Sequence, residues 1–255
     1  MQRKFLVNLA FLLFLNLLVK PFYILGIDAE VQERVGPEEY GMYFALFSLS
    51  MLLNIFLDLG INNFNTRNIA QHSHLLDKHL SGILSVRIIL VGVYAAVVFF
   101  AAFLLNYRGK ELYLLIWLVL NQALIAYILY MRSNLAGLHL FIQDSVVSVM
   151  DRTILIGIMA YILWSDSVSD HVVKIEWFVY ALSVAYGLTA VIVTVLVLRN
   201  AKWGGLNFNP AFAWMIIKRS FPFALLILLM TLYYRSDTIM LERMLPDGKF
   251  QAGVY

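Results

Sequence analysis

Long apolar segments recur along the 255-residue chain and are separated by short polar connections. Seven of them can cross a bilayer, because a transmembrane helix needs about 20 mostly apolar residues. They cover residues 5–27, 40–61, 82–105, 112–131, 144–164, 177–198 and 216–241. Within these segments the apolar residues are continuous and follow neither the helical period of 3.6 residues nor the strand period of 2.0. This pattern indicates spanning helices.

The first apolar segment predicts a retained helix. Its apolar part is too long for a cleaved signal peptide, and the following sequence offers no small-x-small cleavage site. The chain stops just after the seventh span, without a polar tail. We therefore expect an all-α, polytopic membrane bundle that is a piece of a longer transporter.

Composition supports a membrane location. The chain is 62% hydrophobic and 14% charged, whereas soluble domains are about 45–50% apolar and about 25% charged. The absence of cysteine excludes disulfides and cysteine-based metal sites. With a cytoplasmic N-terminus, the inner connections hold nine lysines and arginines and the outer ones hold six. This bias predicts that orientation.

The polar stretch after the second span has a pattern of its own. Apolar residues recur among polar ones over residues 64–80, which is typical of a helix lying in the membrane interface. A plain polar loop is the alternative. His72 and His74 point about 200° apart on a helix, so they predict a solvated face and no metal site.

Seven charged residues fall inside the predicted spans, beyond the first four residues of each. A charge at the bilayer centre costs about 2.5–3.5 kcal/mol, so each must snorkel, pair or face a wet cavity. The cations are Lys20, Arg87, Arg152 and Arg235, and the acids are Asp58, Asp151 and Asp237.

Depth separates these residues into two groups. Lys20 lies past the midplane, one turn after Asn16 and directly before Pro21, which predicts a polar cavity wall beside a kink. Its alternative is snorkelling outward. Arg87 and Asp58 lie near the cytoplasmic ends of their spans, and we expect Arg87 to snorkel.

The remaining charges suggest cavity contacts. Asp151 and Arg152 are adjacent and point about 100° apart, so each is expected to find a partner on another helix. In the seventh span, tyrosines directly precede a closely spaced arginine and aspartate. The expected substrate contacts are Lys20, Arg152, Arg235, Asn16 and Tyr233. The expected coupling or charge-pairing residues are Asp58, Asp151, Asp237 and Arg87.

Enzyme signatures are absent from the sequence. There is no phosphate-binding glycine loop, no Gly-x-Ser-x-Gly elbow and no His-Glu-x-x-His pair. The outer connections are too short for the catalytic loop of a membrane glycosyltransferase. We therefore expect no enzyme activity, no cofactor and no nucleic-acid partner, with H⁺ or Na⁺ coupling left open.

Three segments resemble a known group. They are "RVGPEEYGMYFALFSLS" (residues 34–50), "LDLGINNFNTRNIAQ" (57–71) and "YYRSDTIMLERMLPDGKFQAGVY" (233–255). Their order and spacing resemble bacterial polysaccharide biosynthesis proteins of the O-antigen flippase type, within the multidrug/oligosaccharidyl-lipid/polysaccharide exporter superfamily. The first segment carries Gly36, Tyr40, Gly41 and Tyr43 in a Gly-x-x-x-Tyr-Gly-x-Tyr pattern.

The resemblance implies two lobes of 12–14 helices in all. Residues 1–200 would form the six-helix N-terminal lobe, and residues 201–255 a loop and the first helix of the second lobe. It implies an inner-membrane flippase that moves undecaprenyl-diphosphate-linked oligosaccharide to the periplasmic leaflet. Cavity cations would hold the diphosphate. Polysaccharide polymerase and glycosyltransferases would be partners.

Two other functions are compatible with the same sequence. One is a cation-coupled small-molecule or multidrug exporter of the superfamily, which would use the intramembrane aspartates. The other is a non-transporting membrane scaffold in a polysaccharide assembly complex.

Overall fold

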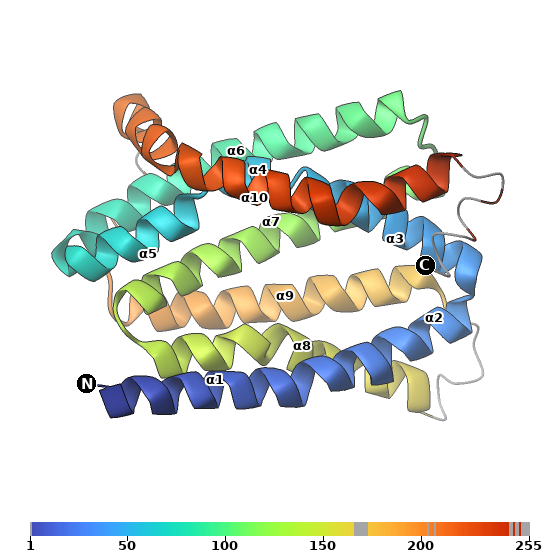
Figure 1. Ribbon diagram of the computed structural model, residues 1–255, viewed down its shortest axis with the longest axis horizontal. Coiled ribbons are helices and arrows are strands. Elements are labelled where there is room, and N and C mark those ends of the chain that lie inside the picture. The colour runs from blue at the N-terminus through green and yellow to red at the C-terminus, as the bar shows by residue number, and fades with distance from the viewer. Residues whose placement is uncertain are drawn as a thin grey trace.

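The computed structural model describes residues 2–165, 173–202, 204–206, 208–244, 247 and 250. Every regular element among these residues is a helix, which confirms the predicted all-α class. Figure 1 shows an up-and-down bundle in which successive long helices run antiparallel. The elements are α1 (Gln2–Phe22), η1 (Tyr23–Asp28), α2 (Ala29–Val35), α3 (Pro37–Leu52), α4 (Ile55–Asp58), α5 (Ile61–Gln71), η2 (Ser73–Leu75), α6 (Leu76–Leu104), α7 (Lys110–Gly137), α8 (Phe141–Trp164), α9 (Ile175–Leu198) and α10 (Pro210–Met244).

Within the described residues, five helices are long and apolar enough to span a membrane. The bent pair Pro37–Leu52 and Ile55–Gln71 makes a sixth if it counts as one span. The backbone of α10 runs through the predicted seventh span. Large apolar side chains lie on the outside, such as Leu17, Leu25 and Phe103, which are 72–76% exposed. Such a surface is stable in lipid and costly in water.

The helices pack in an order that differs from their order in the chain. Helix α8 packs against both α1 and α9, α9 packs against α7, and α3 lies against α7 and α10 (Figure 1). The largest fully buried side chains include Tyr94, Tyr130 and Phe178. This packing brings η1, α3, α7, α8 and α9 around one space near the middle of the bundle.

The first span is longer than predicted and contains a widened turn. Helix α1 continues through Pro21 into η1, a π-helix over Tyr23–Asp28, and then into α2. Short π-helical turns are rare and occur often at functional sites. Gly36 ends this run with φ of 87°, and Pro37 begins α3, where its missing N–H costs no helical hydrogen bond.

The second span is broken where α4 meets α5. Leu59 and Gly60 both adopt left-handed backbone conformations, with φ of 45° and 76°. The two halves of the span are bent by 41°. The Asp58 carboxylate accepts the Asn62 backbone N–H at 3.2 Å, which satisfies one of the free donors at the start of α5. The Asp58 side chain, which directly precedes the break, therefore stabilises the start of α5.

Arg87 closes this junction from α6. It is only 5% exposed, and its guanidinium donates to Asp58 Oδ1 at 2.6 Å, to Asn62 Oδ1 and to the Ala126 carbonyl. The guanidinium also lies 4.8 Å from the Tyr130 ring centroid. The expectation that Arg87 snorkels is therefore wrong, because α4, α5 and α7 surround it with acceptors.

The prediction of one interface helix over residues 64–80 is also wrong. Helix α5 ends at Gln71, and Leu76 and Leu80 belong to α6. Asn65 is fully buried and donates to Ser133 Oγ at 2.8 Å and Asn134 Oδ1 at 2.9 Å on α7. Because its polar side chains bond to α7, this segment is part of the bundle.

Replacing Gly60 with Ala is expected to destabilise the fold. A Cβ there would lie 2.5 Å from the Ser220 carbonyl oxygen and 2.7 Å from Phe223 Cβ, so α10 would have to shift at a cost of about 1–3 kcal/mol. Thermal unfolding in detergent measures the loss. Gly109→Ala is the matched control, since Gly109 also has positive φ but no atom within 4 Å. Equal unfolding temperatures for the two variants would contradict the packing argument.

Replacing Arg87 with Met is expected to cost about 3 kcal/mol, because it leaves the Asp58 carboxylate, which is only 16% exposed, without a cation. The same unfolding measurement applies, and adding Asp58→Asn should restore part of the loss. Arg132→Met is the control, because the Arg132–Asp144 pair at 2.7 Å is more exposed, at 23% and 19%. If Arg87→Met were no worse than Arg132→Met, the pair would not hold the junction.

Candidate functional site

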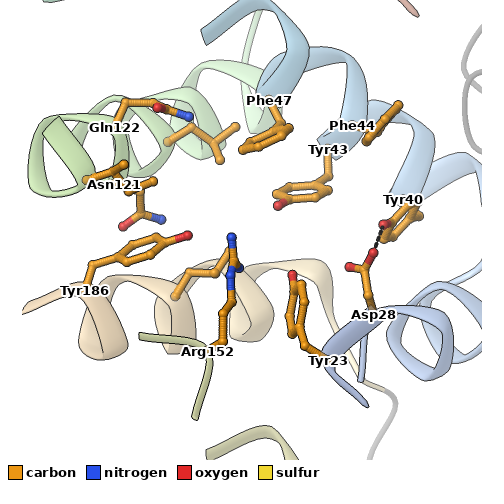
Figure 2. A pocket seen from close by; sticks show the side chains of 13 residues that line it. Tyr23, Asp28, Tyr40, Tyr43, Phe44, Phe47, Asn121, Gln122, Arg152 and Tyr186 are labelled. Atoms are coloured by element: carbon orange, nitrogen blue, oxygen red, sulfur yellow. Dashed lines mark hydrogen bonds between the residues drawn. The ribbon is translucent and has the colours of Figure 1, made fainter. Parts of the chain in front are cut away.

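A cavity of about 220 Å³ lies between η1, α3, α7, α8 and α9 (Figure 2). It is lined by aromatic, amide, apolar and charged side chains. These are Tyr23, Asp28, Tyr40, Tyr43, Phe44, Phe47, Leu118, Asn121, Gln122, Ile125, Arg152, Leu182 and Tyr186. Asn121, Gln122, Arg152 and Tyr186 come from near the middles of α7, α8 and α9, so the cavity reaches the centre of the bundle.

Arg152 is the cation of this cavity. Its guanidinium points between Tyr23 and Tyr186 (Figure 2) and lies 4.5 Å from the Tyr23 ring centroid. It also approaches Asp151, with Nε 3.8 Å from Oδ2, although adjacent helical residues were expected to point apart. That distance is too long for a hydrogen bond. The guanidinium is therefore placed by the Tyr23 ring, a loose ion pair and the neighbouring Tyr186 hydroxyl, on the side of the cavity.

Asp28 forms the opposite end of the site. It is the last residue of the π-helical turn η1, and its Oδ2 accepts the Tyr40 hydroxyl at 3.0 Å. Figure 2 shows its other carboxylate oxygen on the side of the cavity. The bond to Tyr40 connects the first span to α3, so the carboxylate is fixed in orientation.

The two amides on α7 are also oriented by neighbouring helices. Asn121 accepts the Ser183 hydroxyl at 2.7 Å, and Gln122 Oε1 accepts the Asn54 side-chain N–H at 2.8 Å. The Asn121 amide also donates to the Val179 carbonyl at 3.4 Å, so these amides can offer a ligand mainly their remaining N–H groups. The α7 wall thus adds hydrogen-bond donors to the cation on α8.

Aromatic rings form the α3 wall. Tyr40 and Phe44 are stacked with centroids 6.4 Å apart, and Tyr43 and Phe47 are stacked at 5.9 Å. Tyr43 also meets the edge of Phe178 at 5.6 Å. Such contacts hold the rings in place. The cavity therefore combines flat apolar faces with polar groups at fixed positions, as ligand pockets do.

This arrangement is suited to binding. The lining has a guanidinium, amide N–H groups and phenolic hydroxyls, all of which can donate to an anion. Among the described residues, no group of three His, Asp or Glu side chains could hold a metal ion. The chemistry that the geometry supports is recognition of a negatively charged, partly polar ligand.

The structure does not bring all the predicted contact residues together. Lys20 is exposed on α1, and the Asn16 amide donates to Leu12 O of its own helix at 2.9 Å. Tyr233 is 80% exposed on α10. None of these three lines the cavity around Arg152. The side chains of Arg235 and Asp237 lie outside the described residues.

The predicted coupling residues whose side chains the structure describes do not line this cavity either. Asp58 and Arg87 form the ion pair at the α4–α5 junction, away from the lining of the cavity. Asp151 lies beside Arg152, with Oδ2 3.8 Å from Arg152 Nε, but does not line the cavity. The substrate-binding and coupling roles of all these residues stay predictions.

Sequence reasoning missed the cavity acid and most of its aromatic lining. Asp28 directly follows the predicted first span, so the sequence alone places it in a polar connection. The sequence marks Tyr40 and Tyr43 only through the Gly-x-x-x-Tyr-Gly-x-Tyr pattern, yet both line the cavity. That pattern was the available signal, since it places two tyrosines one turn apart on one helix.

The family comparison agrees with this picture. A model of the family described as "Polysaccharide biosynthesis protein" matches residues 6–255, which confirms the resemblance seen in the three motifs. No curated protein and no solved structure matched the chain. With spanning-length helices, a central cavity and a family match over nearly its whole length, the chain is a multi-pass membrane protein that belongs to the polysaccharide biosynthesis protein family.

Proposed function

We propose that this protein is a flippase for a lipid-linked oligosaccharide. It moves an undecaprenyl-diphosphate-linked oligosaccharide from the cytoplasmic to the periplasmic leaflet of the inner membrane by alternating access. The observation that carries the proposal is the position of Arg152, a cation near the middle of a spanning helix that faces a polar cavity.

Energetics support an anionic ligand at Arg152. A cation inside the membrane is costly unless it is hydrated or paired. Its loose contact with Asp151 at 3.8 Å leaves the guanidinium able to bind another anion. Guanidinium binds phosphate oxygens in a bidentate manner, and it keeps its charge at any physiological pH. A diphosphate matches this chemistry, with the amide N–H groups of α7 as further donors.

The size of the cavity suits part of such a substrate. At about 220 Å³, it is below the roughly 300–1,000 Å³ typical of pockets for drug-sized ligands. We propose that it holds the diphosphate and its adjoining group, while the lipid tail stays in the bilayer. The remainder of the path would be completed by the second lobe that begins in residues 201–255.

The proposed role is transport without covalent chemistry. No cofactor is required, and energy would come from H⁺ or Na⁺ coupling. The substrate would be supplied by membrane glycosyltransferases and consumed by a polysaccharide polymerase. The N-terminus would lie in the cytoplasm, as the distribution of cations indicates.

One observation favours a second candidate. The Asp28 carboxylate in the same cavity could bind a cationic small molecule, as an exporter of the related multidrug type would require. Drug sensitivity of a deletion strain that keeps normal surface polysaccharide would favour this candidate. Lipid-linked oligosaccharide movement in proteoliposomes would favour the flippase and would eliminate a non-transporting scaffold.

Replacing Arg152 with Gln in the full-length protein is expected to lower surface polysaccharide at least about tenfold, because hydrogen bonds to a charged group contribute about 1.5–3 kcal/mol. Arg152→Lys should retain part of the activity, since lysine keeps the charge but loses the bidentate geometry. Surface polysaccharide is measured in a strain that lacks the chromosomal gene, and membrane levels are measured by immunoblot.

Arg199→Gln is the matched control for this experiment, because Arg199 is exposed just after α9 and does not line the cavity. It should leave polysaccharide unchanged. Normal polysaccharide with Arg152→Gln at normal membrane levels would remove Arg152 from the mechanism.

A further inference from the structure

Two opposite charges line the central cavity without forming an ion pair. Arg152 and Asp28 both line it, yet the described ion pairs join Arg152 to Asp151 and include none with Asp28. Asp28 is held from the other side by the Tyr40 hydroxyl at 3.0 Å. Figure 2 shows the guanidinium and the carboxylate facing the same space from α8 and η1. A ligand that binds both must be anionic at one end and a hydrogen-bond donor at the other.

The carboxylate can receive donors from a ligand. Tyr40 occupies Oδ2, and the other oxygen lies on the cavity side (Figure 2). An ionised carboxylate accepts hydrogen bonds only, so the ligand must donate to it. The hydroxyl groups of a sugar are such donors. The neighbouring rings of Tyr40 and Phe44 add flat apolar surface beside the carboxylate.

We infer that Asp28 forms a charge-selective subsite for the sugar attached to the diphosphate, accepting neutral or amino sugars and rejecting uronic acids. This inference rests on the proposed function, because Arg152 must hold the diphosphate for the first sugar to reach Asp28. The substrate is then oriented, with its phosphate toward the middle of α8 and its first sugar toward the end of η1.

Electrostatics explain the rejection of uronic acids. Like charges placed side by side at a binding site cost several kcal/mol, and the low dielectric of the bilayer reduces screening by water. A uronic acid would bring a second carboxylate to Asp28. A neutral N-acetylhexosamine would bring hydroxyl and amide donors to the same position.

The experiment measures binding of three soluble probes to the purified full-length protein. They are a short-chain prenyl diphosphate, the same lipid carrying an N-acetylhexosamine, and the same lipid carrying a hexuronic acid. The wild type should bind the N-acetylhexosamine probe at least about tenfold more tightly than the hexuronic acid probe, since a tenfold ratio needs only part of the like-charge penalty.

Variants separate the charge of Asp28 from its structural bond. Asp28→Asn keeps the size and an acceptor oxygen but removes the charge, so the ratio between the two sugar probes should fall to about twofold or less. Tyr40→Phe removes the hydrogen bond to Asp28 but leaves the charge, so the ratio should persist. Loss of the ratio in both variants would still support the charge, and would show that it acts only while the Tyr40 hydroxyl holds the carboxylate in place.

Two results overturn the inference. One is a wild type that binds both sugar probes equally, which needs no variant and so does not depend on Asp28→Asn folding. The other is an Asp28→Asn variant that keeps the full ratio. Failure of the proposed function looks different, because the sugar-free diphosphate would then bind equally well to the wild type and to Arg152→Gln.

Discussion

A charged group inside a bilayer must be satisfied by other groups of the protein, by water or by a ligand, and most of this structure is arranged around two such charges. Arg87 on α6 and Arg152 on α8 belong to one bundle, but their surroundings differ. Arg87 is 5% exposed and bonds to a carboxylate, an amide and a backbone carbonyl. Arg152 lies over one ring with a loose ion pair at 3.8 Å. The first arginine stabilises the fold, and the second is available to a ligand.

Both charges lie beside interruptions in regular helix. Asp58, the partner of Arg87, precedes the left-handed residues Leu59 and Gly60, where the second span bends by 41°. Asp28, which shares the cavity with Arg152, ends the π-helical turn η1 in the first span. Irregular backbone at membrane depth requires burial within protein or contact with a cavity. The junction meets the first condition, and η1 meets the second.

These features are consistent with the transport cycle that we propose. Alternating access needs elements with two stable arrangements, and discontinuous helices are common at transporter binding sites. In this bundle η1 and α3 both line the cavity, and they are connected by the Tyr40–Asp28 hydrogen bond. A substrate that binds to Asp28 and Arg152 would act directly on the contact between these two elements.

The sequence by itself determined the class of this protein and the locations of its spans. A continuous apolar segment of about 20 residues can adopt few structures in lipid, because every backbone polar group there must form its hydrogen bonds within the protein. Depth along a span also identified Arg152 as a charge that cannot reach water easily. The ordered motifs, including Tyr40 and Tyr43, identified the family that the comparison then showed.

Only the tertiary structure decided which charges meet. Sequence position placed Arg87 near a helix end and predicted snorkelling, but its acceptors come from residues 25 to 39 positions away on other elements. The same reasoning placed Lys20 on a cavity wall, whereas its side chain is exposed on α1. The sequence did not indicate Asp28 as a cavity residue, because it follows the end of an apolar run. In the structure it is the last residue of the π-helical turn η1 and lines the cavity. The period of a helix tells which residues share a face, but the partner of that face depends on how the helices pack.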